Sequence, residues 1–201
     1  KENINTHKAI APYFNLLGMS LSKLGKNDEA KKFLLGGINK FPNEISLKSN
    51  IGLVLINLKD YNLAEKYIYE AIKINKEDIY ALHALGVLKR EQLKFKEALI
   101  IFNKIIQKDV KFPKALSLLG QTYLDLAQRN NDKELYILAK KNFLLSSQIF
   151  PTLTDIDYIL SQIIDYSNND FRQKKMLNKI KQLKLNNVQK TFIYFALGKS
   201  F

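Results

Sequence analysis

The side chains that most often perform catalysis or bind metals are scarce in this chain. Its 201 residues include no cysteine and two histidines, His7 and His83. Without cysteine there can be no disulfide, thiolate metal site or thiol nucleophile, and this composition fits a reducing compartment. The two histidines lie far apart in the sequence, and no carboxylate cluster completes a metal site beside either of them. We therefore expect no metal, no cofactor and no catalytic residue.

Three aspartates in one short segment come nearest to an acid–base site. Asp155, Asp157 and Asp165 lie in or beside one expected helix. General acid–base catalysis needs a partner placed to exchange a proton, and this segment supplies none. We expect the three carboxylates to be solvated. No glycine-rich phosphate-binding loop occurs, since the recurring glycines are spaced by the repeat described below.

Charge is the second chemical feature of the chain. The formal net charge is +13, and the segment from Phe171 to Lys190 contains seven basic residues and no acidic one. Such a segment could dock on an acidic surface or on membrane headgroups, although more often it is the solvated face of an outer helix. A basic surface favours an acidic partner. Nucleic acid is disfavoured, because the arginine forks and aromatic stacking motifs that read bases do not stand out here.

An internal repeat predicts the elements that would position these side chains. Glycine recurs every 34 residues, at Gly18, Gly52, Gly86 and Gly120. After each of the first three glycines an alanine follows at twelve residues, and a large apolar residue follows the alanine at four. In the fourth repeat seven residues are inserted before the alanine, and the large apolar residue again follows it at four. These residues are Ala30, Ala64, Ala98 and Ala139, followed by Leu34, Ile68, Phe102 and Phe143. Small residues at the glycine and alanine positions predict that two helices cross closely in each repeat.

This pattern resembles the tetratricopeptide repeat, in which Leu-Gly, Ala, Phe and Pro recur at fixed positions of a 34-residue unit. Lys48 and Lys89 depart from it, because the motif prefers apolar side chains there. The resemblance implies an all-α fold, a right-handed α-α superhelix of about five helix pairs plus a terminal helix in one domain over 1–201. The units are expected near 11–44, 45–78, 79–112, 113–153 with the insertion, 154–187 in degenerate form, and 188–201 as half a unit.

Apolar periodicity places the helices inside these units. We expect pairs over 11–24 and 27–40, 45–58 and 61–74, 79–92 and 95–108, 113–128 and 133–149, 154–166 and 170–184, then a helix over 188–201. The insertion falls within 127–134, where it either lengthens both helices of its pair or forms a protruding loop. The half repeat at the end leaves an apolar helix face that could mediate oligomerisation.

Proteins of this family bind ligands in a groove lined by the first helix of each pair. The groove positions carried over to this sequence are Asn15, Met19, Ser49, Leu53, Asn57, Tyr80, His83, Val87, Arg90, Ser117, Gln121, Asp125, Tyr158 and Gln162. Four of them, Tyr80 to Arg90, share one helix face and combine an aromatic ring, an imidazole and a guanidinium. An ordinary solvated helix surface is an equally open interpretation of this group.

Some members of the family hold the C-terminal carboxylate of heat-shock chaperones through a Lys-Asn-Asn-Lys-Arg constellation. The corresponding positions here are Asn15, Met19, Asn50, Tyr80 and Ala84. Because the cationic members of that clamp are missing, we do not expect chaperone binding.

The resemblance therefore implies a non-catalytic scaffold for a protein or peptide partner, and the net charge predicts acidic character in that partner. Two alternatives remain open. Phe195 to Phe201 resembles the segment before the catalytic half of bacterial repeat-containing sulfotransferases, which would make the chain a substrate-presenting module; the basic charge also allows nucleic-acid association. Because the chain begins at Lys1, we interpret it as a fragment of a longer bacterial protein. We expect a cytoplasmic location and no transmembrane segment, since no apolar run approaches the ~20 residues that span a bilayer.

Overall fold

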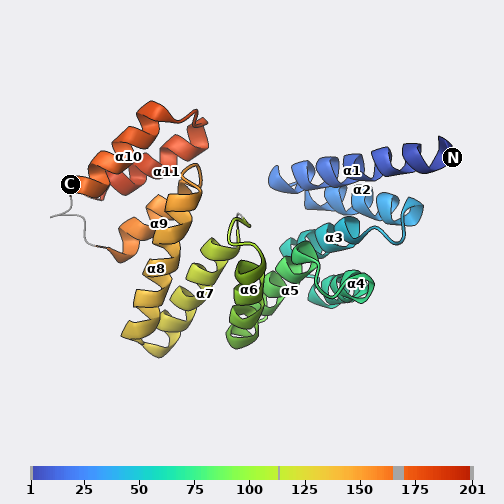
Figure 1. The fold of residues 1–201 in the computed structure, drawn as a ribbon, viewed down its shortest axis with the longest axis horizontal. Helices are drawn as coiled ribbons and strands as arrows, with labels where there is room; N and C mark the ends of the chain where they lie inside the picture. The colour runs from blue at the N-terminus through green and yellow to red at the C-terminus, as the bar shows by residue number, and fades with distance from the viewer. Residues whose placement is uncertain (1, 113, 165–169, 200–201) are drawn as a thin grey trace. The chain divides into compact units, whose positions relative to one another are not determined.

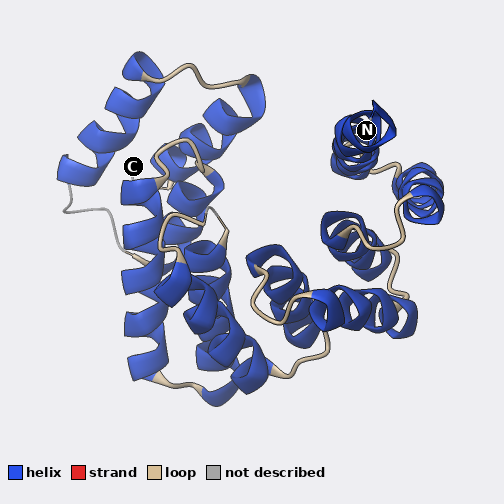
Figure 2. Cartoon of the chain, turned by 45° about the vertical axis from the view of Figure 1, so that its right-hand side comes forward, coloured by secondary structure: helices blue, strands red, loops and turns tan. Residues whose placement is uncertain are grey.

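The computed structural model describes residues 2–112, 114–164 and 170–199, and its regular elements are all α-helices (Figures 1 and 2). The helices are α1 (Glu2–Lys23), α2 (Asn27–Lys40), α3 (Ile45–Asn57), α4 (Tyr61–Ile74), α5 (Ile79–Glu91), α6 (Phe95–Lys108), α7 (Ala115–Asn130), α8 (Lys133–Ile149), α9 (Asp155–Ile163), α10 (Asp170–Gln182) and α11 (Asn187–Gly198). The predicted all-α fold of five helix pairs and a terminal helix is confirmed. Within the described residues, no helix is both long and apolar enough to cross a membrane.

The chain divides into two compact units, Lys1–Ile105 and Ile106–Phe201, here called the N-terminal and the C-terminal unit. In the N-terminal unit α3 lies against its own pair mate α4 and against α1, α2 and α5. Its buried face carries Ile51 and Leu55, which join Leu34, Ile68 and Leu88 in one apolar core. Helix α3 is thus held by the pair before it and by the first helix of the pair after it, as expected for stacked repeats.

The recurring glycines lie where the two helices of a pair cross. A Cβ placed at Gly86 would lie 2.6 Å from Phe102 Cε1, and one at Gly18 would lie 2.6 Å from Leu34 Cγ. The large apolar residue of the second helix therefore covers the glycine of the first. The alanine of each repeat, for example Ala98, is fully buried in the same crossing. The repeat spacing thus places a large apolar side chain of the second helix directly against the backbone at the glycine of the first.

The two lysines that depart from the repeat motif are buried and paired with glutamates. Lys48 on α3 forms an ion pair with Glu70 on α4. Lys89 Nζ on α5 lies 3.3 Å from Glu97 Oε2 and 3.8 Å from Glu65 Oε1. Burial lowers the pKa of Lys89, but the hydrogen bond to Glu97 and the neighbouring negative groups outweigh it and raise this pKa above its usual value. The lysine stems fill apolar positions while their ammonium groups reach carboxylates on adjacent helices.

The seven-residue insertion lengthens both helices of the fourth pair. Helix α7 has 16 residues and α8 has 17, whereas α5 and α6 have 13 and 14. Asp132 begins α8, because its carboxylate accepts hydrogen bonds from the backbone N–H groups of Glu134 and Leu135. The sequence predicted either longer helices or a protruding loop, and the structure has the longer helices.

The C-terminal unit stacks the remaining helices on this long pair. Helix α9 lies against α8 and α11, and Phe143 of α8 packs with Ile156 and Leu160 of α9. A second core joins α10 to α11 through residues such as Met176 and Ile193. Helix α9 ends at Ile163, three residues before the predicted end.

Candidate functional site

Asn15 and Asn57, two of the predicted groove residues, belong to a row of amide and hydroxyl side chains on α1 and α3 that also contains Asn50, which was not predicted. Asn15 Nδ2 donates to Ser46 Oγ at 2.6 Å, and Asn50 Nδ2 donates to Asn15 Oδ1 at 2.8 Å. Further along the same two helices, Asn57 Nδ2 donates to Ser22 Oγ at 3.3 Å. These contacts join residues about one repeat apart, so the same face of two successive first helices carries a ladder of neutral polar groups.

Other predicted groove residues of these helices point toward the core. Ser49 is only 1% exposed, and its hydroxyl donates to the carbonyl of Ile45 at 2.9 Å. A side chain so deeply buried cannot contact a ligand, so the prediction for Ser49 is wrong. Met19 and Leu53 are half-buried and pack against the apolar core. They can contribute only the edge of their side chains to a ligand surface.

The group predicted on α5 is divided between surface and core. Tyr80 is 59% exposed, whereas His83 is 7% exposed. The imidazole is therefore part of the packed interior, and its prediction as a ligand contact is corrected. Val87 and Arg90 are half-buried, and Arg90 Nη1 lies 3.6 Å from Glu91 Oε1. Tyr80 and Arg90 remain as the aromatic and cationic members of this face.

In the C-terminal unit the predicted groove residues form two separate groups. On α7, Gln121 Nε2 donates to Asp125 Oδ1 at 3.0 Å, and Ser117 Oγ donates to the carbonyl of Lys114 at 3.0 Å. On α9, the ring of Tyr158 lies 6.2 Å from each of the rings of Phe192 and Phe195 on α11. Gln162 accepts a hydrogen bond from Lys199, which directly follows α11. Helix α11 therefore occupies part of the surface that Tyr158 and Gln162 were predicted to offer.

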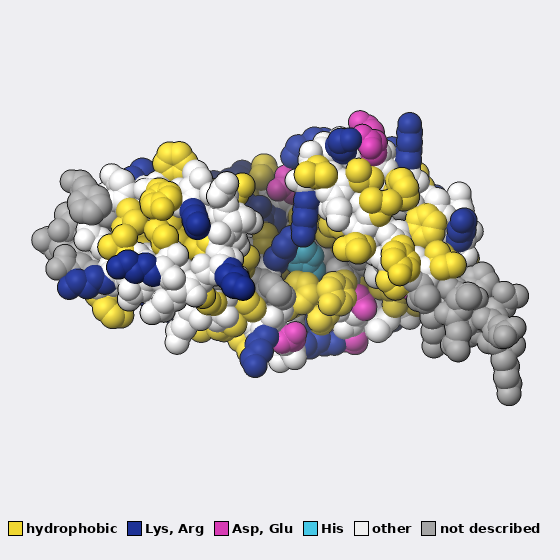
Figure 3. All heavy atoms as spheres, turned by 90° about the horizontal axis from the view of Figure 1, so that it is seen from above, with side chains coloured by type: hydrophobic (Ala, Val, Ile, Leu, Met, Phe, Trp, Pro, Cys, Tyr) yellow, Lys and Arg dark blue, Asp and Glu magenta, His cyan; other side chains and the backbone are white. Residues whose placement is uncertain are grey.

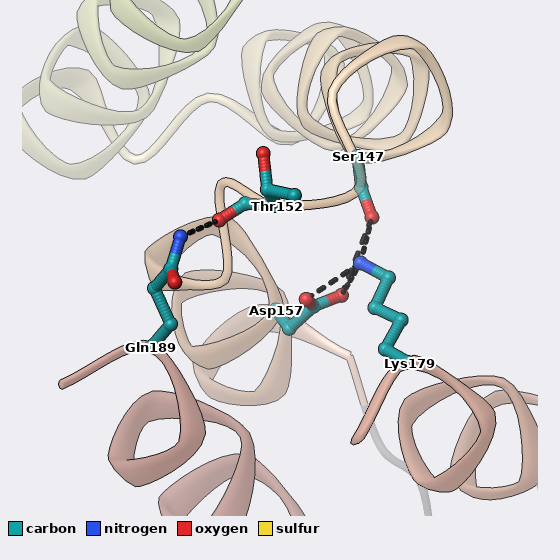
Figure 4. Close-up of polar contacts among 5 residues, drawn as sticks. All are labelled: Ser147, Thr152, Asp157, Lys179 and Gln189. Carbon is teal, nitrogen blue, oxygen red and sulfur yellow. Dashed lines mark hydrogen bonds and ion pairs between the residues drawn. The ribbon is translucent and has the colours of Figure 1, made fainter. Parts of the chain in front are cut away.

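A buried ion pair that the sequence did not predict lies where α8, α9 and α10 meet (Figure 4). Lys179 Nζ lies 2.7 Å and 2.9 Å from the two carboxylate oxygens of Asp157 and 3.0 Å from Ser147 Oγ. Asp157 is 6% exposed and Lys179 is 5% exposed. Burial raises the pKa of the Asp157 carboxyl, against the opposing effect of the Lys179 ammonium.

This pair corrects the expectation that the three aspartates are solvated. Asp155 is exposed as expected, but Asp157 is buried, and Asp165 lies outside the described residues. Lys179 is likewise buried, although the solvated face of an outer helix was the favoured interpretation of the basic segment. One signal was present: Lys179 stands three residues after Met176 and next to Ile180, within the apolar stripe of α10, where a cation needs a partner. Nearby, Gln189 Nε2 donates to the carbonyl of Thr152 at 2.9 Å and ties α11 to the loop before α9.

Metal binding finds no support in the part of the chain that the structure describes. His83 is buried, and the side chain of His7 lies outside the described residues. No cluster of three or more histidine, aspartate or glutamate side chains is placed to hold an ion among the residues described.

Comparison with known proteins finds the repeat in two segments of the chain and the same fold in solved structures. Residues 11–38 and 45–78 match the family model of the tetratricopeptide repeat. Superkiller complex protein 3 of Homo sapiens is 25% identical over 111 residues, which are 55% of this chain and 7% of that protein. The chain thus corresponds to a small part of that relative's length.

Two solved structures share the architecture. TTC0263, a thermophilic TPR protein of Thermus thermophilus, is 14% identical with a TM-score of 0.69 over 93% of this chain and 98% of that one. The first TPR of Spaghetti (RPAP3), bound to the HSP90 peptide SRMEEVD, is 23% identical with a TM-score of 0.51 over 58% of this chain and 95% of that one. At these identities the likeness shows the fold, a stack of helix pairs of the tetratricopeptide type.

Proposed function

We propose that this chain is a non-catalytic scaffold whose N-terminal unit binds a peptide segment of a partner protein on the face shared by α1, α3 and α5. The observation that carries the proposal is the ladder of neutral polar side chains formed by Asn15, Asn50 and Asn57. Tetratricopeptide repeats commonly mediate interactions between proteins, and the RPAP3 repeat, whose fold this chain shares, was solved with a peptide bound.

The ladder suits the backbone of a peptide. An asparagine amide offers two N–H donors and a carbonyl oxygen with two acceptor sites. Asn15 uses one N–H for Ser46 and one acceptor site for Asn50, which leaves one of each. The bonds between successive helices hold these amides in fixed orientations before a ligand arrives, which lowers the entropic cost of binding. Neutral amides match peptide N–H and C=O groups whatever the ligand's sequence.

Tyr80 and Arg90 supply the selectivity in this proposal. An exposed tyrosine on a rigid helix is a frequent anchor at protein interfaces, and a guanidinium can grip a carboxylate with two parallel hydrogen bonds. These residues fit a partner with acidic character, in keeping with the net charge of +13. Because the cationic residues of the carboxylate clamp are missing, we do not expect the ligand to be a chaperone tail of the kind that some tetratricopeptide-repeat proteins hold.

Site-specific photo-crosslinking tests this function. We would replace Tyr80 by a photoreactive phenylalanine analogue, irradiate the full chain in a lysate of its source cells, and identify the adducts by mass spectrometry. The matched control places the same analogue at Tyr69, an exposed tyrosine on the second helix α4. We expect a defined protein adduct at position 80 that Arg90→Ala weakens. Equal labelling at positions 80 and 69, or labelling that Arg90→Ala leaves unchanged, would remove the groove from consideration.

The role as a module beside a sulfotransferase domain rests on Phe195 to Phe201 alone and stays a prediction, as does the cytoplasmic location. No observation in the described part of the fold favours the nucleic-acid alternative over peptide binding.

A further inference from the structure

The second helices of the C-terminal unit carry an exposed surface that the groove proposal does not use. The buried Asp157–Lys179 pair and Ser147 hold α10 against α8 and α9. Outside this contact, α8 exposes Ile137 at 65%, and α10 exposes Phe171 at 75%. Ile137 lies beside Leu144 and Leu145 on the wall of one hollow, and exposed apolar side chains that gather in this way mark candidate interaction sites. We call the outward-facing surface of these two helices the α8–α10 surface.

Shallow hollows mark the α8–α10 surface. One of about 240 Å³ opens between the helices and is lined by Leu144, Phe171 and Met176 together with Asp157 of the buried ion pair. A hollow of about 490 Å³ follows α8 and shares Leu144 with the first. A third, of about 460 Å³, follows α10 and shares Phe171. Neighbouring hollows share wall residues and so lie next to one another, and we call the three together the depression. The hollow on α8 is mainly apolar, and the other two combine apolar walls with polar and charged side chains.

The rim of this depression is positively charged. Lys140 and Lys141 border the hollow on α8, and Lys174 and Lys175 border the one on α10. The sequence contains no Asp or Glu from Leu135 to Thr154, nor from Phe171 to Phe201. The carboxylate of Asp157 is neutralised by Lys179. The face of the C-terminal unit that Figure 3 shows, at the left, carries Lys and Arg among hydrophobic side chains, and no acidic side chain is visible on it.

We propose that the α8–α10 surface is a docking site for an acidic segment of a partner protein that carries large apolar side chains. The basic rim selects acidic residues by charge complementarity, and the hollows accept apolar anchors of the kind that dominate interface energetics. A simple solvated helix face would account for the lysines but not for the apolar walls between them.

The same features argue against a bilayer or a nucleic acid as the occupant. Binding to a membrane surface depends on apolar side chains that project into the lipid. Ile137 and Phe171 are exposed enough to do so, but a bilayer would leave the hollows walled by Leu144 and Met176 unfilled. A phosphate backbone would use the lysines but would leave these apolar walls without a partner. This proposal is independent of the groove on α1, α3 and α5, so either can fail without the other.

A random twelve-residue peptide library displayed on phage tests the proposal with the full chain as bait. We expect the enriched peptides to combine a net negative charge with at least one large apolar residue. Synthetic copies of those peptides should bind the triple variant Lys140→Glu, Lys141→Glu, Lys175→Glu about tenfold more weakly at low salt, because steering and rim attraction reverse sign. Ile137→Ser should weaken them at any salt concentration, since it removes part of the apolar hollow.

The matched control reverses three exposed lysines on the second helices of the N-terminal unit, with Lys32→Glu, Lys73→Glu and Lys96→Glu. This control changes the net charge by the same amount. If both triple variants lost the same peptide affinity, total charge alone would explain the effect and the proposal would be overturned. Circular dichroism and thermal melts check that each variant folds. Enriched peptides that are neutral or basic would also overturn it. So would co-sedimentation with phosphatidylserine vesicles, but not with phosphatidylcholine vesicles, in the absence of any peptide binder.

Discussion

At the scale of the single residue, a left-handed backbone conformation recurs in the turn inside each of four helix pairs. Gly25, Lys59, Leu93 and Asn131 have φ values of 78°, 63°, 60° and 50°. Glycine adopts this conformation without a steric cost, and asparagine tolerates it, whereas a leucine is strained there. The third repeat therefore carries a residue that its own backbone disfavours.

Leu93→Gly should relieve that strain. The Leu93 side chain is exposed, so removing it loses little packing. We expect the free energy of unfolding to rise by about 1 kcal/mol, the typical cost of a left-handed conformation for an L-residue, partly offset by the greater freedom of glycine in the unfolded chain. Urea denaturation measures the change. Gly25→Ala is the reciprocal control, because the same conformation there should make the substitution destabilising; a gain in stability with Gly25→Ala would contradict the argument.

The buried pair Asp157–Lys179 gives a second prediction at this scale. Asp157→Leu alone leaves the Lys179 ammonium buried beside an apolar residue, which should cost about 3–5 kcal/mol. The double variant Asp157→Leu, Lys179→Met removes both charges and should recover most of that loss, because apolar replacements of a buried ion pair are often neutral or stabilising. A double-mutant cycle by chemical denaturation measures the coupling. Additive losses in the cycle would show that the two charges do not depend on each other.

At the scale of the element, the crossing of the two helices in a pair depends on the recurring glycine. In an ordinary helix Gly→Ala gains up to about 1 kcal/mol from helix propensity. At Gly86 the added methyl would lie 2.6 Å from the buried Phe102 ring, so we expect a net loss of about 1–3 kcal/mol from overpacking. Gly36 on α2 is the matched control, because the nearest side-chain atom there, Phe14 Cε1, is 3.9 Å away. Gly36→Ala should leave the melting temperature unchanged or raise it; a similar fall in both variants would contradict the close crossing.

How far the sequence predicts these elements depends on the kind of contact. The Gly86–Phe102 crossing was predictable, because the same spacing recurs in the first three repeats and only a close helix pair explains it. The Asn15–Asn50 bond follows the same logic, since the two residues are one repeat plus one position apart. The Asp157–Lys179 pair occurs once and joins two different helices, so it leaves no periodic pattern in the sequence from which it could be predicted. The burial of His83 was also hidden, because sequence spacing selects a helix face but does not show how deeply each side chain on that face is buried.

At the scale of the whole chain, each compact unit contains its own apolar core. Ile51 is fully buried in the N-terminal unit and Phe143 in the C-terminal unit. In repeat arrays stability comes from each repeat and its nearest neighbours, so a local defect need not spread through the chain. Phe143→Ala should cost about 3–5 kcal/mol through lost burial and a cavity, and most of that loss should appear in α7, α8 and α9.

Hydrogen exchange followed by mass spectrometry separates this outcome from global unfolding. With Phe143→Ala we expect faster amide exchange in α7–α9 and nearly unchanged protection in α3 and α4. Ile51→Ala is the reciprocal variant and should accelerate exchange in α1–α4 while sparing α8 and α9. If either substitution accelerated exchange equally in all helices, the two units would unfold as one cooperative body. Because the peptide groove and the α8–α10 surface belong to different units, independent unfolding would also let each surface be disabled without the other.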